Sequence, residues 1–322
     1  MADKKVFKLE QTKGNFKLSG IVVGITKENS YIEGETKDNV PYRTVKFGVK
    51  TSNTNIINTE LYGAEQDFVY PYSSTEKKSL KIPFKDRNEE LQDTYHIIGI
   101  NVTTEGNEKV TYVEYDAVEP IHQGFNDGDS VYVTGELKPN SFISTSGDLV
   151  SNFKYSIKSI TFKEKPVDFD DPKFKETASF EQDIVITDTN LDKKTNKVLV
   201  NGYAIGYADS FKQVQYVVHY DKNEKLGNNF LKLKFGDYIK VLGICINSPT
   251  IEAVEDEWGS EVPTGYKTGG KYVSELRITA VAKDKDGTSI FKKKRYKEED
   301  FIQQDSSERI SAEEDLTDDL PF

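Results

Sequence analysis

The sequence of 322 residues contains one cysteine, one methionine, one tryptophan and three histidines. A single cysteine, Cys245, excludes an intrachain disulfide and a multi-cysteine zinc site. The histidines His96, His122 and His219 lie far apart without ligand spacing, so we predict no metal and no other cofactor. The phosphate loop GxxxxGK[ST], the zinc motif HExxH and the nucleophile motif Gly-x-Ser-x-Gly are also missing, and the sequence nominates no enzyme.

Long hydrophobic runs are absent as well. No apolar stretch reaches transmembrane length, and the N-terminal MADKKVFKLE lacks the core of a signal peptide, so we expect a cytoplasmic protein. Hydrophobic residues make up 36% of the chain and charged residues 30%. This composition fits small globular domains better than one large core, and the length predicts about two domains.

The formal net charge of -11 is unevenly distributed. Residues 298–322 carry ten acids and one base, which leaves 42 bases and 44 acids in residues 1–297. A nearly neutral body attracts phosphates only weakly over long distances. Binding of nucleic acid would therefore depend on local basic strips and on stacking against the 18 Tyr and 18 Phe.

The body contains a weak internal repeat. In each half a Gly-Asp pair precedes alternating apolar residues, and Gly135 and Gly243 each follow the Gly of that pair by seven positions. The matched segments are 125–137 with 233–245, 16–25 with 198–207, and 156–162 with 274–281. Glycines inside alternating strands are typical of bulges or bends in small barrels, so each half predicts a bent strand, middle strands, a Gly-Asp strand and a final strand.

This order resembles the OB-fold, a five-stranded barrel. We predict an all-β chain of two tandem OB-fold-like five-stranded barrels. The first spans 1–162 with an insertion at about 64–124, which includes the strand-like runs 95–102 and 109–118. A linker at 163–176 leads to the second barrel at 177–296, and a disordered acidic tail covers 297–322. Two lectin-like or tail-fibre β-sandwiches remain the alternative.

The tail ends in DDLPF, in which Leu, Pro and Phe follow two acids. This tip resembles that of the bacterial and phage single-stranded-DNA-binding protein family. The resemblance implies that the tip recruits replication and recombination proteins, such as a polymerase, a helicase or recombinase mediators, into basic-rimmed pockets. The predicted partner-binding residues are Asp318, Asp319, Leu320, Pro321 and Phe322. Ordinary bacterial members have one barrel per chain, and the tandem arrangement is similar to phage-encoded proteins, so oligomeric state stays open between monomer and dimer.

OB-fold proteins hold nucleic acid across strands 2 and 3 and the loops joining strands 1–2 and 4–5. In the segment RTVKFGVK, residues 43, 45, 47 and 49 share one face, so Lys46 and Lys50 form a basic stripe on the other. The predicted DNA-binding residues are Tyr31, Tyr42, Arg43, Lys46, Lys50, Phe142, Phe211, Lys212, Tyr216, Tyr220, Trp258, Tyr266 and Lys267.

The sequence thus predicts a non-enzymatic protein that binds and protects single-stranded DNA without sequence preference during replication, recombination and repair. A β-rich virion or adhesion module without DNA binding is the main alternative, and a metal-dependent nuclease with clustered carboxylates comes third.

Overall fold

The computed structural model describes residues 8–89, 91, 94–140, 142–143, 149–150, 152–249 and 272–301. Within these residues the chain is predominantly β, as the sequence predicts. Two α-helices, α1 (Glu114–Gly124) and α2 (Glu224–Phe230), interrupt the strands in the described part. The fold is therefore not purely all-β.

Five strands of the N-terminal half pair in a closed ring, which we call the first ring. They are β1 (Gly14–Val23), β3 (Pro41–Lys50), β4 (Ile56–Ala64), β11 (Ser130–Pro139) and β14 (Phe153–Phe162). β1 pairs antiparallel with β3 and β11, and β3 pairs antiparallel with β4. β14 closes the ring by pairing parallel with β4 and antiparallel with β11.

The C-terminal half repeats this order in a second ring. Its strands are β15 (Thr177–Asp192), β16 (Lys197–Ile205), β17 (Phe211–His219), β18 (Tyr238–Pro249) and β19 (Tyr272–Val281). β15 pairs antiparallel with β16 and β18, β16 with β17, and β19 pairs parallel with β17 and antiparallel with β18. The two halves are therefore built from five strands in the same cyclic order.

The Gly-Asp repeat predicted from sequence marks equivalent positions, because β11 and β18 occupy the same place in their rings. Gly128 and Gly236 both have positive φ, 100° and 79°. The following carboxylates close the same turn: Asp129 accepts from the Asn126 N–H at 2.7 Å, and Asp237 accepts from the Lys234 N–H at 2.9 Å. The register also shifts just before residues 135 and 243 in both strands.

One matched pair of the predicted repeat is wrong. The segment 16–25 lies in β1, whereas 198–207 lies largely in β16, the second strand of its ring. The counterpart of β1 is β15, because both pair with the second and fourth strands of their rings. Glycines in alternating strands occur at both ring positions, so their spacing alone does not assign a strand its neighbours.

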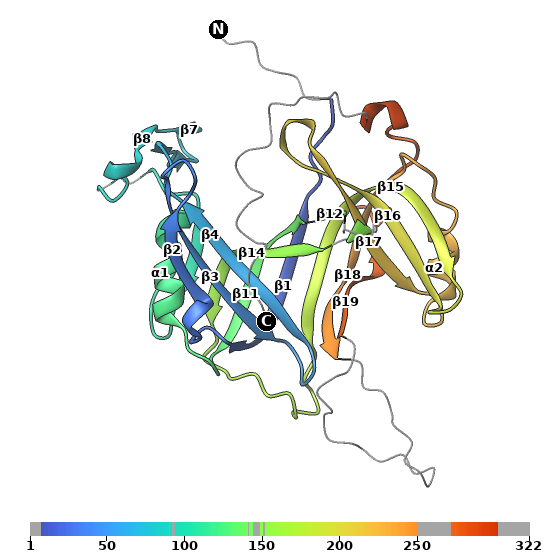
Figure 1. The fold of residues 1–322 in the computed structure, drawn as a ribbon, viewed down its shortest axis with the longest axis horizontal. Coiled ribbons are helices and arrows are strands. Elements are labelled where there is room, and N and C mark those ends of the chain that lie inside the picture. The colour runs from blue at the N-terminus through green and yellow to red at the C-terminus, as the bar shows by residue number, and fades with distance from the viewer. Residues whose placement is uncertain are drawn as a thin grey trace.

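The chain between β4 and β11 contains short elements and α1. They are β5 (Phe68–Val69), β6 (Tyr72–Ser73), β7 (Lys78–Ser79), β8 (Ile82–Pro83), the 3-10 turn η2 (Phe84–Asp86), β9 (Ile100–Thr103) and β10 (Val110–Tyr112). β9 pairs parallel with β14 and carries the sheet outward to β10. β5 to β8 form two small two-stranded sheets at one end of the first ring (Figure 1).

The run 109–118, predicted to be strand-like, turns helical after Tyr112. Ala117, Val118 and Ile121 are buried at helical spacing, and this non-local burial outweighs the β-branched residues that suggested a strand. Gly63 permits the close approach of α1, because a Cβ there would lie 2.3 Å from the Tyr115 nitrogen. α2 occupies the same place between the third and fourth strands of the second ring, and both helices lie on the outer sides of the molecule (Figure 1).

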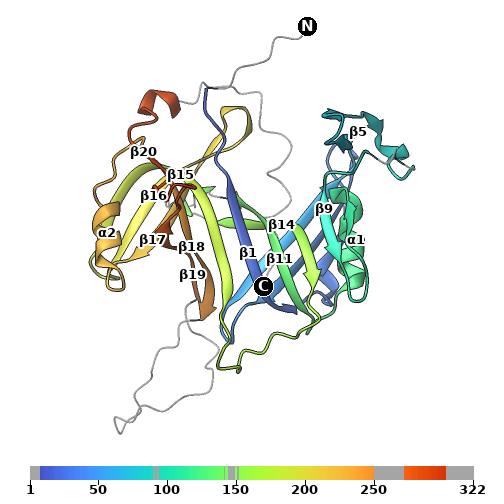
Figure 2. The same cartoon turned by 180° about the vertical axis from the view of Figure 1, so that it is seen from behind.

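The two rings meet along β1 and β15, which pair antiparallel and lie side by side in Figures 1 and 2. One buried hydrophobic cluster runs through both rings. Polar contacts cross the same junction: Asn55 donates to the Cys245 carbonyl at 3.0 Å and accepts from the Asn247 N–H at 2.7 Å. The rings therefore share one continuous sheet and core, and the segment 163–176 joins parts that already touch.

The remaining described elements are short: η1 (Glu28–Ser30), β2 (Tyr31–Glu35), β12 (Phe142–Ile143), β13 (Leu149–Val150), η3 (Tyr207–Asp209), β20 (Phe291–Lys292) and η4 (Glu298–Phe301). The last of them corrects the predicted start of the disordered tail at 297. Phe301 is buried in a small cluster on the second ring together with Leu9, Val185, Ile205 and Tyr296. The acidic composition around Phe301 predicted disorder, because it does not show that this side chain packs against residues distant in the sequence.

Candidate nucleic-acid interface

The second and third strands of the first ring present an aromatic and basic outer surface. On β3, Val45, Phe47 and Val49 are buried in the core, as the alternation predicts. Tyr42, Lys46 and Lys50 have the opposite parity and therefore point outward. The stripe predicted from sequence lies on one face of the hairpin formed by β3 and β4.

Two tyrosines stack on this surface. Tyr42 on β3 and Tyr62 on β4 have ring centroids 5.5 Å apart at 28°, and Tyr62 is 44% exposed. Lys46 lies 4.0 Å from the carboxylate of Glu60, which Lys154 of β14 also approaches at 3.6 Å. We call this surface the β3–β4 face and define it by Tyr42, Lys46, Lys50, Tyr62 and Lys154.

The ion pairs on the β3–β4 face are weak enough for a bound phosphate to replace the carboxylate partner of a lysine. The side chains of Lys46 and Lys154 are 43% and 34% exposed, and pairs of this kind contribute about 0–1 kcal/mol. One carboxylate, Glu60, pairs with Lys46 and Lys154, and the Lys50 ammonium lies 5.5 Å from the centre of the Phe169 ring. The three lysines of the face therefore outnumber the carboxylate that they contact, although the chain is acidic. Such a surface offers planar rings for bases and ammonium groups for phosphates.

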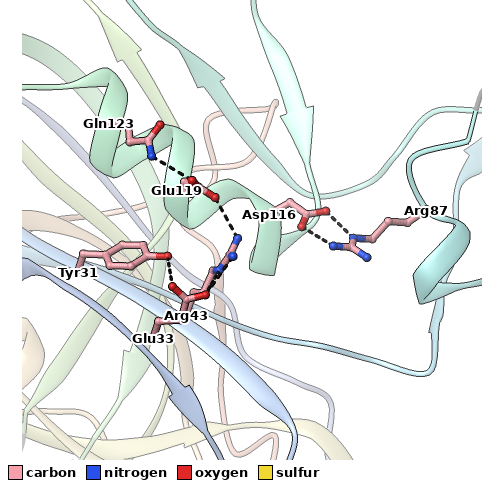
Figure 3. A network of polar contacts seen from close by, with 7 residues as sticks. All are labelled: Tyr31, Glu33, Arg43, Arg87, Asp116, Glu119 and Gln123. Atoms are coloured by element: carbon pink, nitrogen blue, oxygen red, sulfur yellow. Dashed lines mark hydrogen bonds and ion pairs between the residues drawn. The ribbon is translucent and has the colours of Figure 1, made fainter.

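Two other predicted residues of the first ring are held in an internal network, drawn in Figure 3. The Tyr31 hydroxyl donates to Glu33 at 3.0 Å, and Arg43 donates to Glu33 at 3.1 Å and to Glu119 of α1 at 3.2 Å. Burial raises the pKa of Tyr31, and the hydrogen bonds from Tyr31 and Arg43 lower the pKa of Glu33. The Arg43 guanidinium also lies over the Tyr115 ring at 4.6 Å. Arg43 therefore fastens α1 to β2 and β3, and its predicted contact with DNA has no support in this geometry.

A second arginine in Figure 3 extends the network into the insertion. Arg87 donates to both carboxylate oxygens of Asp116 at 2.6 and 2.7 Å, a bidentate pair. Its guanidinium lies 3.9 Å from the centre of the Phe84 ring. Gln123 donates to Glu119 at 3.0 Å from the last turn of the helix. Arg87 thus holds the segment after η2 to α1, and Arg43 holds α1 to β2 and β3.

In the second ring the predicted residues separate into buried and surface positions. Tyr216 is fully buried and stacks on Phe180 at 5.9 Å, so its prediction as a DNA contact is wrong. Phe211 packs edge-on against Phe301 at 5.1 Å, and the Tyr220 hydroxyl donates to Asn228 at 3.1 Å. Lys212 is exposed. The sequence contained the signal for Tyr216, because Gln213 and Gln215 alternate with Val214 and Tyr216, which places Tyr216 on the apolar face of the strand.

An ion cluster occupies the outer face of the second ring. Glu275 accepts from Lys197 at 2.6 Å and Arg277 at 2.7 Å, and it lies 2.9 Å from a ring nitrogen of His219. Burial opposes ionisation of Glu275, but the hydrogen bonds from Lys197 and Arg277 outweigh it, and its pKa is lowered. Burial lowers the pKa of His219, because it disfavours the charged imidazolium. The side chain of Glu275 is 7% exposed, against 20% for Glu60, so these bases are paired with a more deeply buried carboxylate than Lys46 and Lys154 are.

Several predicted residues lie outside the described residues. They are Trp258, Tyr266 and Lys267, the side chain of Phe142, and the tip residues Asp318, Asp319, Leu320, Pro321 and Phe322. Across the part of the chain that the structure describes, no group of His, Cys, Asp and Glu could hold a metal ion. No helix among the described residues is long and apolar enough to span a membrane.

The YorF family model matches residues 14–319, which include both rings and the segment between them. The chain belongs to the YorF family. No curated protein matches the sequence of this YorF family member significantly.

Solved structures of the single-stranded DNA binding protein from Thermus aquaticus match weakly. The wild-type protein gives a TM-score of 0.39 at 10% identity, covering 85% of this YorF family chain and 93% of that chain. A deletion mutant of the same protein gives 0.38 at 11% identity, covering 85% and 95%.

Sequence reasoning missed two members of the β3–β4 face in this YorF family chain, Tyr62 and Lys154. Tyr62 could have been found, because it alternates with buried Leu61 and lies two residues after Glu60 on a predicted strand. Lys154 could not, because its place beside Glu60 depends on the parallel pairing of β14 with β4, which joins segments about a hundred positions apart.

Proposed function

We propose that this YorF family member binds single-stranded DNA without sequence preference, and that the strand lies on the β3–β4 face. The observation that carries the proposal is the outward pair of stacked tyrosines, Tyr42 and Tyr62, flanked by Lys46 and Lys154 on neighbouring strands. Aromatic rings stack on any base, and lysine ammonium groups pair with any phosphate, so such a surface binds DNA of any nucleotide sequence.

The proposal includes two OB-fold barrels, one for each ring. It is supported by the cyclic order of the pairings, in which the first strand neighbours the second and fourth, and the fifth pairs parallel with the third. OB-fold proteins bind oligonucleotides on strands 2 and 3, which correspond to β3 and β4 here. The first ring is the main binding ring in this proposal, because the outer face of the second is occupied by the Glu275 cluster and by Phe301.

The expected energetics follow from the composition of the face. Stacking contributes roughly 1–3 kcal/mol per base, as judged by alanine substitution. A body that is nearly neutral displaces few counterions, so affinity should fall with salt less steeply than for a strongly basic protein. The proposal is a binding protein without a catalytic step, which coats DNA during replication, recombination and repair.

The acidic tail completes the proposal as a recruiting segment. Phe322 would enter a partner's pocket with its carboxylate paired to a base, while Asp318 and Asp319 meet the basic rim. The partners would be proteins of replication and recombination.

The test is a fluorescence anisotropy titration of the full chain with labelled oligo-dT and with a duplex of equal length, over a range of salt. Tyr62→Ala removes one exposed ring, and Lys46→Ala removes one exposed charge. Tyr132→Ala is the matched control, since Tyr132 is 37% exposed on β11, which pairs with neither β3 nor β4.

We expect single strands to bind more tightly than duplex, and Tyr62→Ala to weaken oligo-dT binding by about fivefold or more. Lys46→Ala should reduce the salt slope by roughly one unit or less. Tyr132→Ala should leave both quantities unchanged. Equal affinity for duplex and single strand, or equal loss with Tyr62→Ala and Tyr132→Ala, would refute the proposal and favour a protein-interaction module.

A further inference from the structure

A pocket of about 260 Å³ opens between the end of β4 and two parts of the insertion, the segment 66–98 and the start of α1. It is lined mainly by apolar side chains, and two of them, Tyr70 and Ile98, are 54% and 69% exposed. We call it the insertion pocket. Apolar side chains this exposed within one hollow are typical of a binding surface.

The floor of the insertion pocket is built from packed aromatic rings and an ion pair. Phe84 and Tyr115 line it and are buried with Val69 in a small cluster of their own. Phe84 packs edge-on against Tyr115 at 6.0 Å, and the bidentate Arg87–Asp116 pair holds this cluster to the helix. The pocket therefore exists before any ligand arrives, which lowers the ordering cost of binding.

The insertion pocket continues the β3–β4 face. Ala64, which lines the pocket, is the register partner of Tyr42, and register partners project to the same side of a sheet. Tyr42 in turn stacks on Tyr62. A strand whose bases stack on the tyrosines would thus reach the pocket at its next base.

The polar groups of the pocket suit the edge of a base better than a phosphate. Besides the hydroxyls of two tyrosines, the polar side chains of the lining are Gln66 and Glu114, and the Glu114 carboxylate lies 3.4 Å from the Lys158 ammonium. A carboxylate repels phosphate and only accepts hydrogen bonds. It can pair with the exocyclic amino group of cytosine, whereas thymine presents an acceptor at the same position.

From this geometry we infer that the insertion pocket holds one unstacked base of the bound strand and favours cytosine over thymine. The inference rests on the proposed function of the β3–β4 face and adds a modest base preference to it. The insertion is then part of the binding site, because it supplies the walls Tyr70 and Ile98. Stacking between apolar side chains with an edge read by hydrogen bonds is a general way to hold an extruded base.

The test measures binding of labelled oligo-dC and oligo-dT of equal length to the full chain above neutral pH. Ile98→Ala and Tyr70→Ala trim the walls at exposed positions, so folding should be retained. Val110→Ala is the matched control, since Val110 is 45% exposed on β10 and does not line the pocket. Glu114→Gln keeps the shape and adds a donor that suits thymine. The readout is the change in the dC to dT affinity ratio from wild type to variant, because the two pyrimidines also differ in intrinsic stacking and this difference cancels in the comparison.

We expect Ile98→Ala and Tyr70→Ala each to weaken oligo-dC binding by about fivefold or more, with a smaller effect on oligo-dT. Glu114→Gln should lower the dC to dT affinity ratio, and Val110→Ala should change neither affinity. If Tyr62→Ala weakens binding but the three pocket variants behave like Val110→Ala, the base pocket is refuted while the proposed function stands. If the wild-type chain binds neither oligonucleotide, both are refuted.

Discussion

The burial of Phe301 predicts that residues 298–301 contribute to the stability of the folded body. Its ring is 7% exposed and stacks on Tyr203 at 4.7 Å, with edge-on contacts to Phe211 at 5.1 Å and Tyr296 at 5.7 Å. Truncation of a buried Phe to Ala costs about 3–5 kcal/mol. Because Phe301 ends a four-residue 3-10 turn on a small cluster that can partly collapse, we expect the low end, about 3 kcal/mol.

The assay compares urea unfolding of the full chain, residues 1–301, residues 1–297 and Phe301→Ala. The chain 1–301 should unfold at the same urea concentration as the full protein. The chain 1–297 and Phe301→Ala should both lose about 3 kcal/mol of unfolding free energy with little change in slope. Glu299→Ala is the control, because its exposed ion pair with Lys297 should contribute almost nothing.

Equal midpoints for 1–297 and 1–301 would refute this reasoning, since they would show that the burial of Phe301 adds no stability. The result also decides how the tail is removed in binding experiments. A deletion that starts at 298 would unpack Tyr203 and Phe211 and confuse lost charge with lost structure, so the deletion should start at 302.

Three further predictions concern the buried ring, the ion cluster and the tail. The Tyr216 hydroxyl is buried without a hydrogen-bond partner among the described residues, so Tyr216→Phe should raise unfolding free energy by up to about 1 kcal/mol and leave oligo-dT binding unchanged. Burial lowers the pKa of His219 below 6.5, so the native state takes up this proton at lower pH than the unfolded chain does. The unfolding free energy that neutral His219 contributes is therefore fully present above pH 6.5, the unfolded pKa, and is lost as the pH falls below it. His219→Gln should flatten this decline, measured as the urea midpoint at each pH. Deleting 302–322 should preserve or tighten oligo-dT binding at low salt, whereas Phe322→Ala should reduce recovery of replication proteins in pull-downs with DNA affinity unchanged; DNA affinity lost in either variant would contradict this role.

The sequence by itself determined the local features of this protein. The alternation of RTVKFGVK decided which side of β3 is buried, because successive side chains of a strand point to opposite faces. The Gly-Asp turns at Gly128 and Gly236 were recognisable because positive φ favours glycine. The same alternation would have placed Tyr216 in the core had it been applied to β17.

The tertiary structure decided what depends on residues far apart in the chain. Residues 114–124 became α1 because their apolar side chains are buried against β3, β4 and β9, although the run resembled a strand. Arg43 was drawn into the network with Glu119, and Phe301 found its site beside Tyr203, through contacts that no local pattern contains. Periodicity sets the direction of each side chain, but its partners come from strand pairing and packing, so only the folded chain could separate the cations and rings at the surface from those buried in internal contacts.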